Sequence, residues 1–160
     1  MSRPAAADDR DPFAVFRPRR GRLVSSVVGV VALLVFTVGA VSLPARDAIF
    51  GDWGPIDRAM VIGCGGAVAL LMWRYATIRA VPTRERLVVR NLVTTRELEW
   101  AQVVRVQFGG GAPWVTLELS DTDTVAVMAI QKADGPFGRA EAARLSALVQ
   151  ALSSGRPGAS

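Results

Sequence analysis

An uninterrupted apolar segment near the start of the chain constrains the fold more than any other feature. No charged residue occurs from Leu23 to Leu43, and Arg22 and Pro44 bound this segment. As a helix rising about 1.5 Å per residue, it would be ~31 Å long, which matches the hydrocarbon core of a bilayer. The sequence therefore predicts a transmembrane helix over residues 23–43.

A second apolar segment follows after a short polar connection. It runs from Ala59 to Trp73 and would be too short to span a bilayer if it ended at Arg74. Extended to Ile78 it reaches a spanning length, with the guanidinium of Arg74 reaching the membrane interface. We therefore expect a second transmembrane helix over residues 59–78. The alternative is a buried helix of a soluble protein.

The distribution of basic residues predicts the orientation of these segments. The net charge is +5, and its excess flanks the apolar segments, whereas a nucleic-acid-binding protein needs a basic patch on its folded domain. Basic residues near transmembrane helices favour the cytoplasmic side. We therefore expect no nucleic-acid partner and a multi-pass protein of the cell membrane with both termini in the cytoplasm. The arginines that support this orientation are Arg17, Arg19, Arg20 and Arg22 before the first segment, and Arg74, Arg79, Arg84 and Arg86 at or after the end of the second.

Two other interpretations of the apolar segments stay open. An arginine-rich stretch before an apolar run is also typical of a signal peptide, and residues 40–42 are small enough for cleavage, although the run is longer than usual. If only the first segment inserted, the rest of the chain would lie outside the cell after a single crossing.

The apolar period changes to two after the second segment, which predicts a small folded domain over residues 80–154. Asp121 to Asp123 indicates a turn, and the glycines at 109–111 indicate the flexible tip of a hairpin. The expected strands cover residues 84–90, 94–98, 104–108, 114–119 and 124–130.

An amphipathic helix is predicted at the end of this domain, over residues 139–153. Leu145, Leu148, Val149 and Leu152 have the spacing of one helix face. Short antiparallel strands followed by one helix predict a partly open barrel that the helix caps. The domain organisation expected from the whole sequence is a disordered basic cytoplasmic tail (1–22), two transmembrane helices (23–43 and 59–78) joined by an extracytoplasmic loop (44–58), the folded domain (80–154) and a disordered tail (155–160).

Several short motifs occur in a characteristic order within this domain. They are Leu87-Val88-Val89-Arg90-Asn91, Glu99-Trp100-Ala101-Gln102-Val103, Val106 and Phe108, Trp114 with Leu117 and Leu119, and Met128-Ala129-Ile130-Gln131 before Asp134-Gly135. Their order resembles the bacterial PH-like domain of actinobacterial membrane proteins of the low-molecular-weight protein antigen type. The resemblance covers roughly residues 80–135 and implies a PH-like barrel. The chain departs from the family at Asp121-Thr122-Asp123, where the family often has Asp-Gly.

The residue types that usually carry chemistry are scarce. The chain has no histidine and a single cysteine, Cys64, which excludes His-based metal sites, Cys/His zinc sites and an internal disulfide. Glu97 and Glu99 share a strand face but have no base beside them, and Asp121 and Asp123 lack the further ligands of a calcium loop. We therefore expect no catalytic, metal or cofactor site, no small-molecule substrate and no enzymatic activity.

The sequence thus predicts a transmembrane hairpin of two helices followed by a small, mainly β PH-like partly open barrel with a C-terminal capping helix. Its expected function is that of a cytoplasm-facing interaction or scaffold module at the cell membrane, with membrane lipid and a membrane protein as partners. The alternative is a module that binds anionic lipid headgroups through Arg84, Arg86 and Arg90. Trp114, beside the glycine tip, is a candidate contact for a protein partner.

Overall fold

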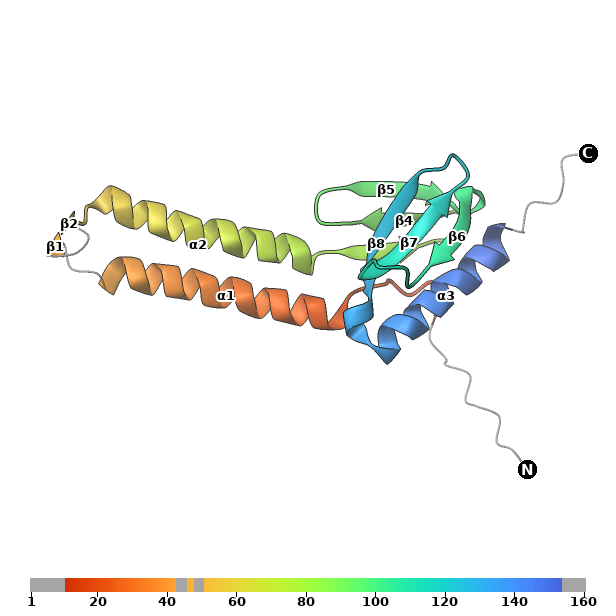
Figure 1. Ribbon diagram of the computed structural model, residues 1–160, viewed down its shortest axis with the longest axis horizontal. Coiled ribbons are helices and arrows are strands. Elements are labelled where there is room, and N and C mark those ends of the chain that lie inside the picture. Colours follow the sequence, from red (N-terminus) through yellow and green to blue (C-terminus); the bar gives the residue numbers. More distant parts are fainter. Residues whose placement is uncertain (1–10, 43–45, 48–50, 154–160) are drawn as a thin grey trace, which may run out of the picture. The chain divides into compact units, whose positions relative to one another are not determined.

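The computed structural model describes residues 11–42, 46–47 and 51–153, and these divide into two compact units. One unit comprises residues 19–77 and is built from two long helices. The other unit joins the residues up to Pro18 with those from Ile78 onward and contains the strands of the folded domain (Figure 1). The folded domain is therefore discontinuous in sequence, with the helical unit inserted into it.

The helical unit is an antiparallel hairpin of α1 (Arg19–Ser42) and α2 (Pro55–Ala76) (Figure 1). Two short strands, β1 (Arg46–Asp47) and β2 (Gly51–Asp52), pair between them. Both helices begin four residues earlier than the apolar pattern predicts. Helix α2 can begin at Pro55 because proline suits the first helical position, and the Asp57 carboxylate accepts a hydrogen bond from the Gly54 amide at 2.8 Å.

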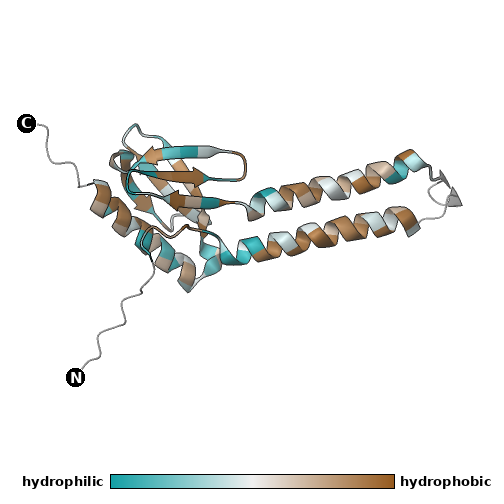
Figure 2. Ribbon diagram, turned by 180° about the vertical axis from the view of Figure 1, so that it is seen from behind, coloured by the Kyte–Doolittle hydropathy of each residue, from teal (hydrophilic) through white to brown (hydrophobic). Residues whose placement is uncertain are grey.

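Small residues bring the two helices close together at two levels. A Cβ atom added to Gly65 would lie 2.6 Å from the Cβ of Phe36, and one added to Gly29 would lie 3.1 Å from the Cβ of Met72. Most other side chains point away from the partner helix, since only 17% of the apolar window of α1 and 6% of that of α2 is buried. The two helices are therefore apolar on their outer surfaces as well as between each other (Figure 2).

Two three-stranded antiparallel sheets form most of the folded domain. Their strands are β3 (Arg79–Pro82), β4 (Arg86–Arg90) and β5 (Thr95–Glu99) in one sheet, and β6 (Val103–Gln107), β7 (Trp114–Leu119) and β8 (Thr124–Gln131) in the other. Strand β8 also contacts β3 and β4, so the two sheets meet there. The strands from β4 to β8 confirm the expected set to within two residues at each end.

Strand β3 was not expected, because the apolar pattern continues the second helix to Ile78. In the structure α2 ends at Ala76, Ile78 is buried in the folded domain, and β3 pairs with β4. The Thr77 hydroxyl donates to the carbonyl of Arg74 at 2.8 Å, which satisfies one of the last carbonyls of the helix. The chain therefore changes from helix to strand within three residues.

Alternating side chains of both sheets form the core together with α3 (Pro136–Ser153). Leu145, Leu148 and Val149 are buried and Leu152 is half-buried, which confirms the predicted apolar face of the helix. The helix contacts β6, β8 and both 3-10 turns, η1 (Trp100–Gln102) and η2 (Lys132–Asp134). The structure thus has the expected strands and terminal helix.

The segment of residues 11–18, here called the strap, packs on the folded domain, and α1 begins at Arg19, which corrects the prediction of a disordered tail over residues 11–22. The rest of that predicted tail, residues 1–10, and the tail predicted over residues 155–160 lie outside the described residues. Phe16 is fully buried in the folded domain, and its backbone exchanges two hydrogen bonds with Ala80 of β3, at 2.9 and 3.0 Å. The pairing stays confined to this one bridge because the next hydrogen-bonded positions on either side contain Pro18 and Pro82, which have no amide hydrogen. The sequence analysis did not predict this contact, because one buried aromatic side chain produces no periodic pattern of apolar residues.

Candidate functional site

Arg144 of α3 is a polar side chain with several partners in the folded domain, and it contacts the strap. Its Nη1 donates to the carbonyls of Ala14, Pro12 and Asp11 at 2.9, 3.2 and 3.3 Å. Its Nη2 donates to the Glu141 carboxylate at 2.6 Å. Its guanidinium carbon lies 3.9 Å from the centroid of the Phe16 ring. A planar group with five donors can satisfy several carbonyls and stack on a ring at the same time, which a lysine cannot do.

Sequence reasoning missed this cluster because it predicted this helix from its apolar face. In the structure Glu141 is buried, and Arg144 is largely covered by the strap. The only signal in the sequence was an arginine and a glutamate three residues apart on one helix, a spacing that is common on solvated faces. The cluster serves to fix the strap onto the domain.

The outer face of the β3–β4–β5 sheet carries the arginines that were predicted to bind lipid headgroups. Arg86 and Arg90 both lie on β4 and are exposed, whereas Arg84 lies in the turn before it. Arg86 donates to the Glu97 carboxylate of β5 at 2.6 Å. The hydrogen bond and the negative charge of Glu97 raise the pKa of Arg86 above its ordinary value. One of the three predicted arginines therefore already forms an ion pair with a neighbouring strand.

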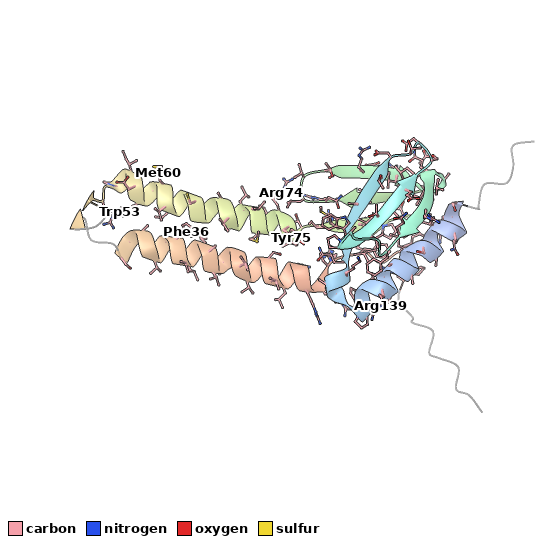
Figure 3. All side chains as sticks on the ribbon, in the orientation of Figure 1. Phe36, Trp53, Met60, Arg74, Tyr75 and Arg139 are labelled. Atoms are coloured by element: carbon pink, nitrogen blue, oxygen red, sulfur yellow. The ribbon has the colours of Figure 1, made fainter. Side chains whose placement is uncertain are left out.

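Of the remaining predicted arginines, some belong to the folded domain and the others to the helical unit. Arg79 belongs to β3 and lies directly opposite Arg90 of β4, so the structure brings together two residues from separate predicted clusters. Arg74 lies in the last turn of α2, on the other unit (Figure 3). Arg17 lies in the strap, and the first turn of α1 contains Arg19, Arg20 and Arg22.

The glycine tip and Trp114 lie at the β6–β7 connection. Gly109, Gly110 and Gly111 all have positive φ values, which confirms their role as the turn of a hairpin. The Lys132 ammonium donates to the Gly109 carbonyl at 3.1 Å. Trp114 is the first residue of β7 and is half-buried, so part of its ring is accessible to a partner.

Asn91 joins the end of β4 to β8 through its side-chain amide. Its Nδ2 donates to the Ala126 carbonyl at 2.7 Å, and its Oδ1 accepts from the Met128 amide at 3.2 Å. Beside it, the loop of residues 91–94 and strand β8 border a shallow hollow of about 320 Å³. The Asn91 amide therefore takes the place of a neighbouring strand at this edge of β8.

The acidic turn between β7 and β8 is organised by its own side chains. The Asp121 carboxylate accepts from the Asp123 amide at 3.1 Å, and Asp123 in turn lies 3.4 Å from Arg96. Thr122 has a positive φ of 68°. These contacts confirm that Asp121 and Asp123 form a turn. Within the part of the chain that the structure describes, no group of three His, Cys, Asp or Glu side chains lies close enough to hold a metal ion.

Comparison with known proteins agrees with this architecture. Residues 78–147 match the family model described as bacterial PH domain. Uncharacterized proteins of Mycobacterium bovis and of two strains of Mycobacterium tuberculosis are each 33% identical to this chain over 111 residues, which is 69% of this chain and 65% of each relative. No solved structure matches the chain significantly. The family match begins at Ile78, so it contains Arg144 but not the strap.

Proposed function

We propose, from the premise that residues 78–147 are a bacterial PH domain, that this chain is a membrane-anchored, non-catalytic interaction module. PH domains generally bind lipids or proteins and are in general not enzymes. In this proposal α1 and α2 cross the cell membrane as a hairpin, and the PH domain faces the cytoplasm. Its partners are membrane lipid and a protein of the same membrane.

The pairing of Phe16 with Ala80 is the observation that carries this proposal. Phe16 precedes both apolar helices and Ala80 follows them, yet their backbones exchange two hydrogen bonds. Both residues must therefore lie on the same side of any membrane that the helices enter. A single crossing by α1 would separate them, and cleavage of a signal peptide near Ser42 would remove Phe16 from the core in which it is buried. The contact therefore favours two crossings and an intact N-terminal segment.

The exposed surface of the two helices supports their insertion in a bilayer. The described residues include two helices long and apolar enough to cross a membrane. Large apolar side chains such as Leu34, Val35 and Leu70 are more than half exposed. In water such a surface would be unfavourable, whereas lipid chains would cover it at no cost.

The orientation is supported by the arginines at the ends of the helices. Arg19, Arg20 and Arg22 lie in the first turn of α1, and Arg74 lies in the last turn of α2, so all four lie at the ends joined to the PH domain. Clusters of arginine remain preferentially in the cytoplasm during insertion. The PH domain would then lie in the cytoplasm with them.

Labelling of introduced cysteines in intact cells tests this orientation. In a Cys64→Ala background, we place one cysteine at Val93, which is 82% exposed in the PH domain, and another at Asp52, between the helices. A membrane-impermeant maleimide should label position 52 in intact cells and position 93 only after permeabilisation. Labelling of position 93 in intact cells would contradict the cytoplasmic assignment.

A protein partner is proposed to contact Trp114. A photo-crosslinking residue at this half-buried position should capture a membrane protein in cells, whereas the same residue at Val104, which is 67% exposed on β6, serves as the matched control. Equal capture at both positions, or none at either, would contradict a specific role of Trp114.

The alternative function is binding of anionic lipid headgroups through Arg84, Arg86 and Arg90. An ion pair of one of these arginines affects which of them can bind. Because Glu97 already pairs with Arg86, that arginine would have to give up an ion pair to bind a headgroup. Arg90 has no such pair among the described residues, and it faces Arg79 instead. A headgroup site on this face would therefore be centred on Arg90.

A further inference from the structure

Three arginines lie side by side across the outer face of the PH domain's first sheet. Arg79 of β3 is directly opposite Arg90 of β4. On the other side of β3, the antiparallel bridge of Phe16 with Ala80 places Arg17 of the strap opposite Arg79, one register position further along. All three side chains are exposed, while their neighbours Phe16 and Ala80 point into the core. We call Arg17, Arg79 and Arg90 the arginine row.

The next positions on the same face separate the arginine row from the carboxylates of β5. Val15 of the strap, Val81 and Val88 occupy these positions, and Val88 is opposite Glu97. Glu97 is paired with Arg86, one level further along β4. At the level of the arginine row itself, β5 contributes Thr95, which is uncharged. The sheet therefore supplies no counter-charge at this level.

Like charges directly opposite each other in a sheet are destabilising. None of the three arginines makes an ion pair or a side-chain hydrogen bond within the described residues. An anion between the guanidinium groups of β3, β4 and the strap would relieve this repulsion. Arg105 and Arg139, by contrast, lie on β6 and α3, away from this sheet face.

We propose that the arginine row binds a phosphate group, carried either by an anionic lipid headgroup or by a soluble phosphate compound. Guanidinium groups donate paired hydrogen bonds to phosphate oxygens, and three adjacent groups surround a tetrahedral anion better than one. The strap is essential to this site, since it supplies Arg17 from outside the residues that match the PH family. This proposal rests on the role of the PH domain as an interaction module but not on its orientation.

The position of the row along the chain favours a lipid source. Arg17 precedes the first residue of α1 by two positions, and Arg79 follows the last residue of α2 by three. At no more than ~3.6 Å per residue, the chain keeps these two arginines within about 7 and 11 Å of the helix ends. If the helices cross a membrane, this is the depth at which lipid phosphates occur.

Titration of the full chain in nonionic detergent tests the proposal. The probes are a short-chain phosphatidylglycerol, a short-chain phosphatidylcholine and inorganic phosphate, each followed by the NMR signals of the arginine side chains. The test variant is Arg79→Gln/Arg90→Gln, and the control is Arg105→Gln/Arg139→Gln, which removes the same charge from the same domain. We expect the test variant to lose about tenfold or more in affinity for the phosphate probe, and the control to change by less than about twofold.

The probes also distinguish the source of the phosphate. Saturation by phosphatidylglycerol that inorganic phosphate does not reverse assigns the site to lipid headgroups, whereas saturation by inorganic phosphate assigns it to a soluble compound. Absence of saturation with every probe, or equal losses in both double variants, would overturn the proposal. If the test variant does not fold, Arg17→Gln replaces it, because this strap residue is exposed. The labelling experiment above fails or succeeds independently of these results.

Discussion

The guanidinium of Arg144 stacks on the ring of Phe16, with 3.9 Å between its central carbon and the ring centroid. The two residues come from opposite ends of the described chain, one before the helical hairpin and one in the last helix. The Phe16 ring is fully buried. In this stacked position, Nη1 of Arg144 donates hydrogen bonds to three carbonyls of the strap. The strap therefore depends on one side chain of α3.

Replacement of Arg144 should release the strap. In Arg144→Lys the ammonium cannot bond several carbonyls while stacking on Phe16, so we expect the strap to loosen even though the charge is kept. The free energy of unfolding should fall by about 1 to 3 kcal/mol, because carbonyls of the strap lose their hydrogen-bond donor. Limited proteolysis near residue 14 measures the loosening. Arg139→Lys, an exposed position of the same helix, should leave the cleavage rate unchanged.

Truncation of Phe16 should destabilise the whole PH domain rather than the strap alone. Phe16→Ala removes a fully buried ring, and such changes cost about 3 to 5 kcal/mol in closed cores. Thermal unfolding of the full chain in detergent should show a lower midpoint. Val15→Ala, at a position that is 38% exposed, is the matched control. Equal midpoints for the two variants would mean that the strap is not part of the cooperative core.

The helical hairpin should be sensitive at Gly65 and tolerant at Gly63. A Cβ atom at Gly65 would lie 2.6 Å from Phe36, whereas one at Gly63 would meet nothing within 4 Å. We expect Gly65→Ala to cost about 1 to 3 kcal/mol by forcing the helices apart, and Gly63→Ala to be neutral. Thermal denaturation followed by helical circular dichroism compares the two. A stable Gly65→Ala hairpin would contradict the observed packing.

An aspartate at position 91 should make the stability of the PH domain dependent on pH. In Asn91→Asp the ionised carboxylate would face the Ala126 carbonyl, to which the amide now donates at 2.7 Å. The protonated carboxyl can donate instead, so its pKa should be higher in the folded than in the unfolded state, where it is about 3.9. The folded state then binds more protons, and stability relative to the native sequence should fall as the pH rises above about 4. Unfolding midpoints of both proteins at several pH values measure this difference, and a constant difference would contradict the role assigned to the amide.

The repetitive features of the fold could be predicted from the sequence, and the single contacts could not. Alternation located β4 to β8, and the spacing of Leu145, Leu148 and Val149 located α3, because many residues contribute to each pattern. The strap, in contrast, depends on one buried ring and one arginine. Strand β3 was missed because the apolar pattern of α2 continues to Ile78, the residue immediately before the strand.

For the helical hairpin too, one property of the packing could be predicted from the sequence and another could not. Matching residues by their distance from the two helix ends predicts the level at which the helices face each other, and the pairs Gly29 with Met72 and Phe36 with Gly65 confirm it. The same matching also puts Gly39 about level with Gly63, yet neither glycine has a neighbour within 4 Å of an added Cβ. An all-round apolar helix gives no signal for its rotation about its own axis.

For the candidate site, the residue types could be predicted from the sequence, whereas their pairing across strands could not. The predicted arginines of β4 are exposed, but the ion pair of Arg86 with Glu97 depends on the register of two strands. The opposition of Arg79 and Arg90 depends on the unexpected strand β3. Residue types alone indicated a basic face, and strand pairing decides which of its members remain available.

The discontinuous domain also has a consequence for the order in which the protein is made. The strap leaves the ribosome before the helical hairpin, and its partner strand β3 follows only after both helices have been synthesised. At about 5 to 20 residues per second, this interval is on the order of several seconds. During this interval Phe16 has no core to enter, because the strands that bury it have not yet been synthesised. If the hairpin crosses a membrane twice, as proposed, the bridge to Ala80 would form only in chains whose two ends lie on the same side, and a chain that crossed only once would leave the edge of β3 without the strap.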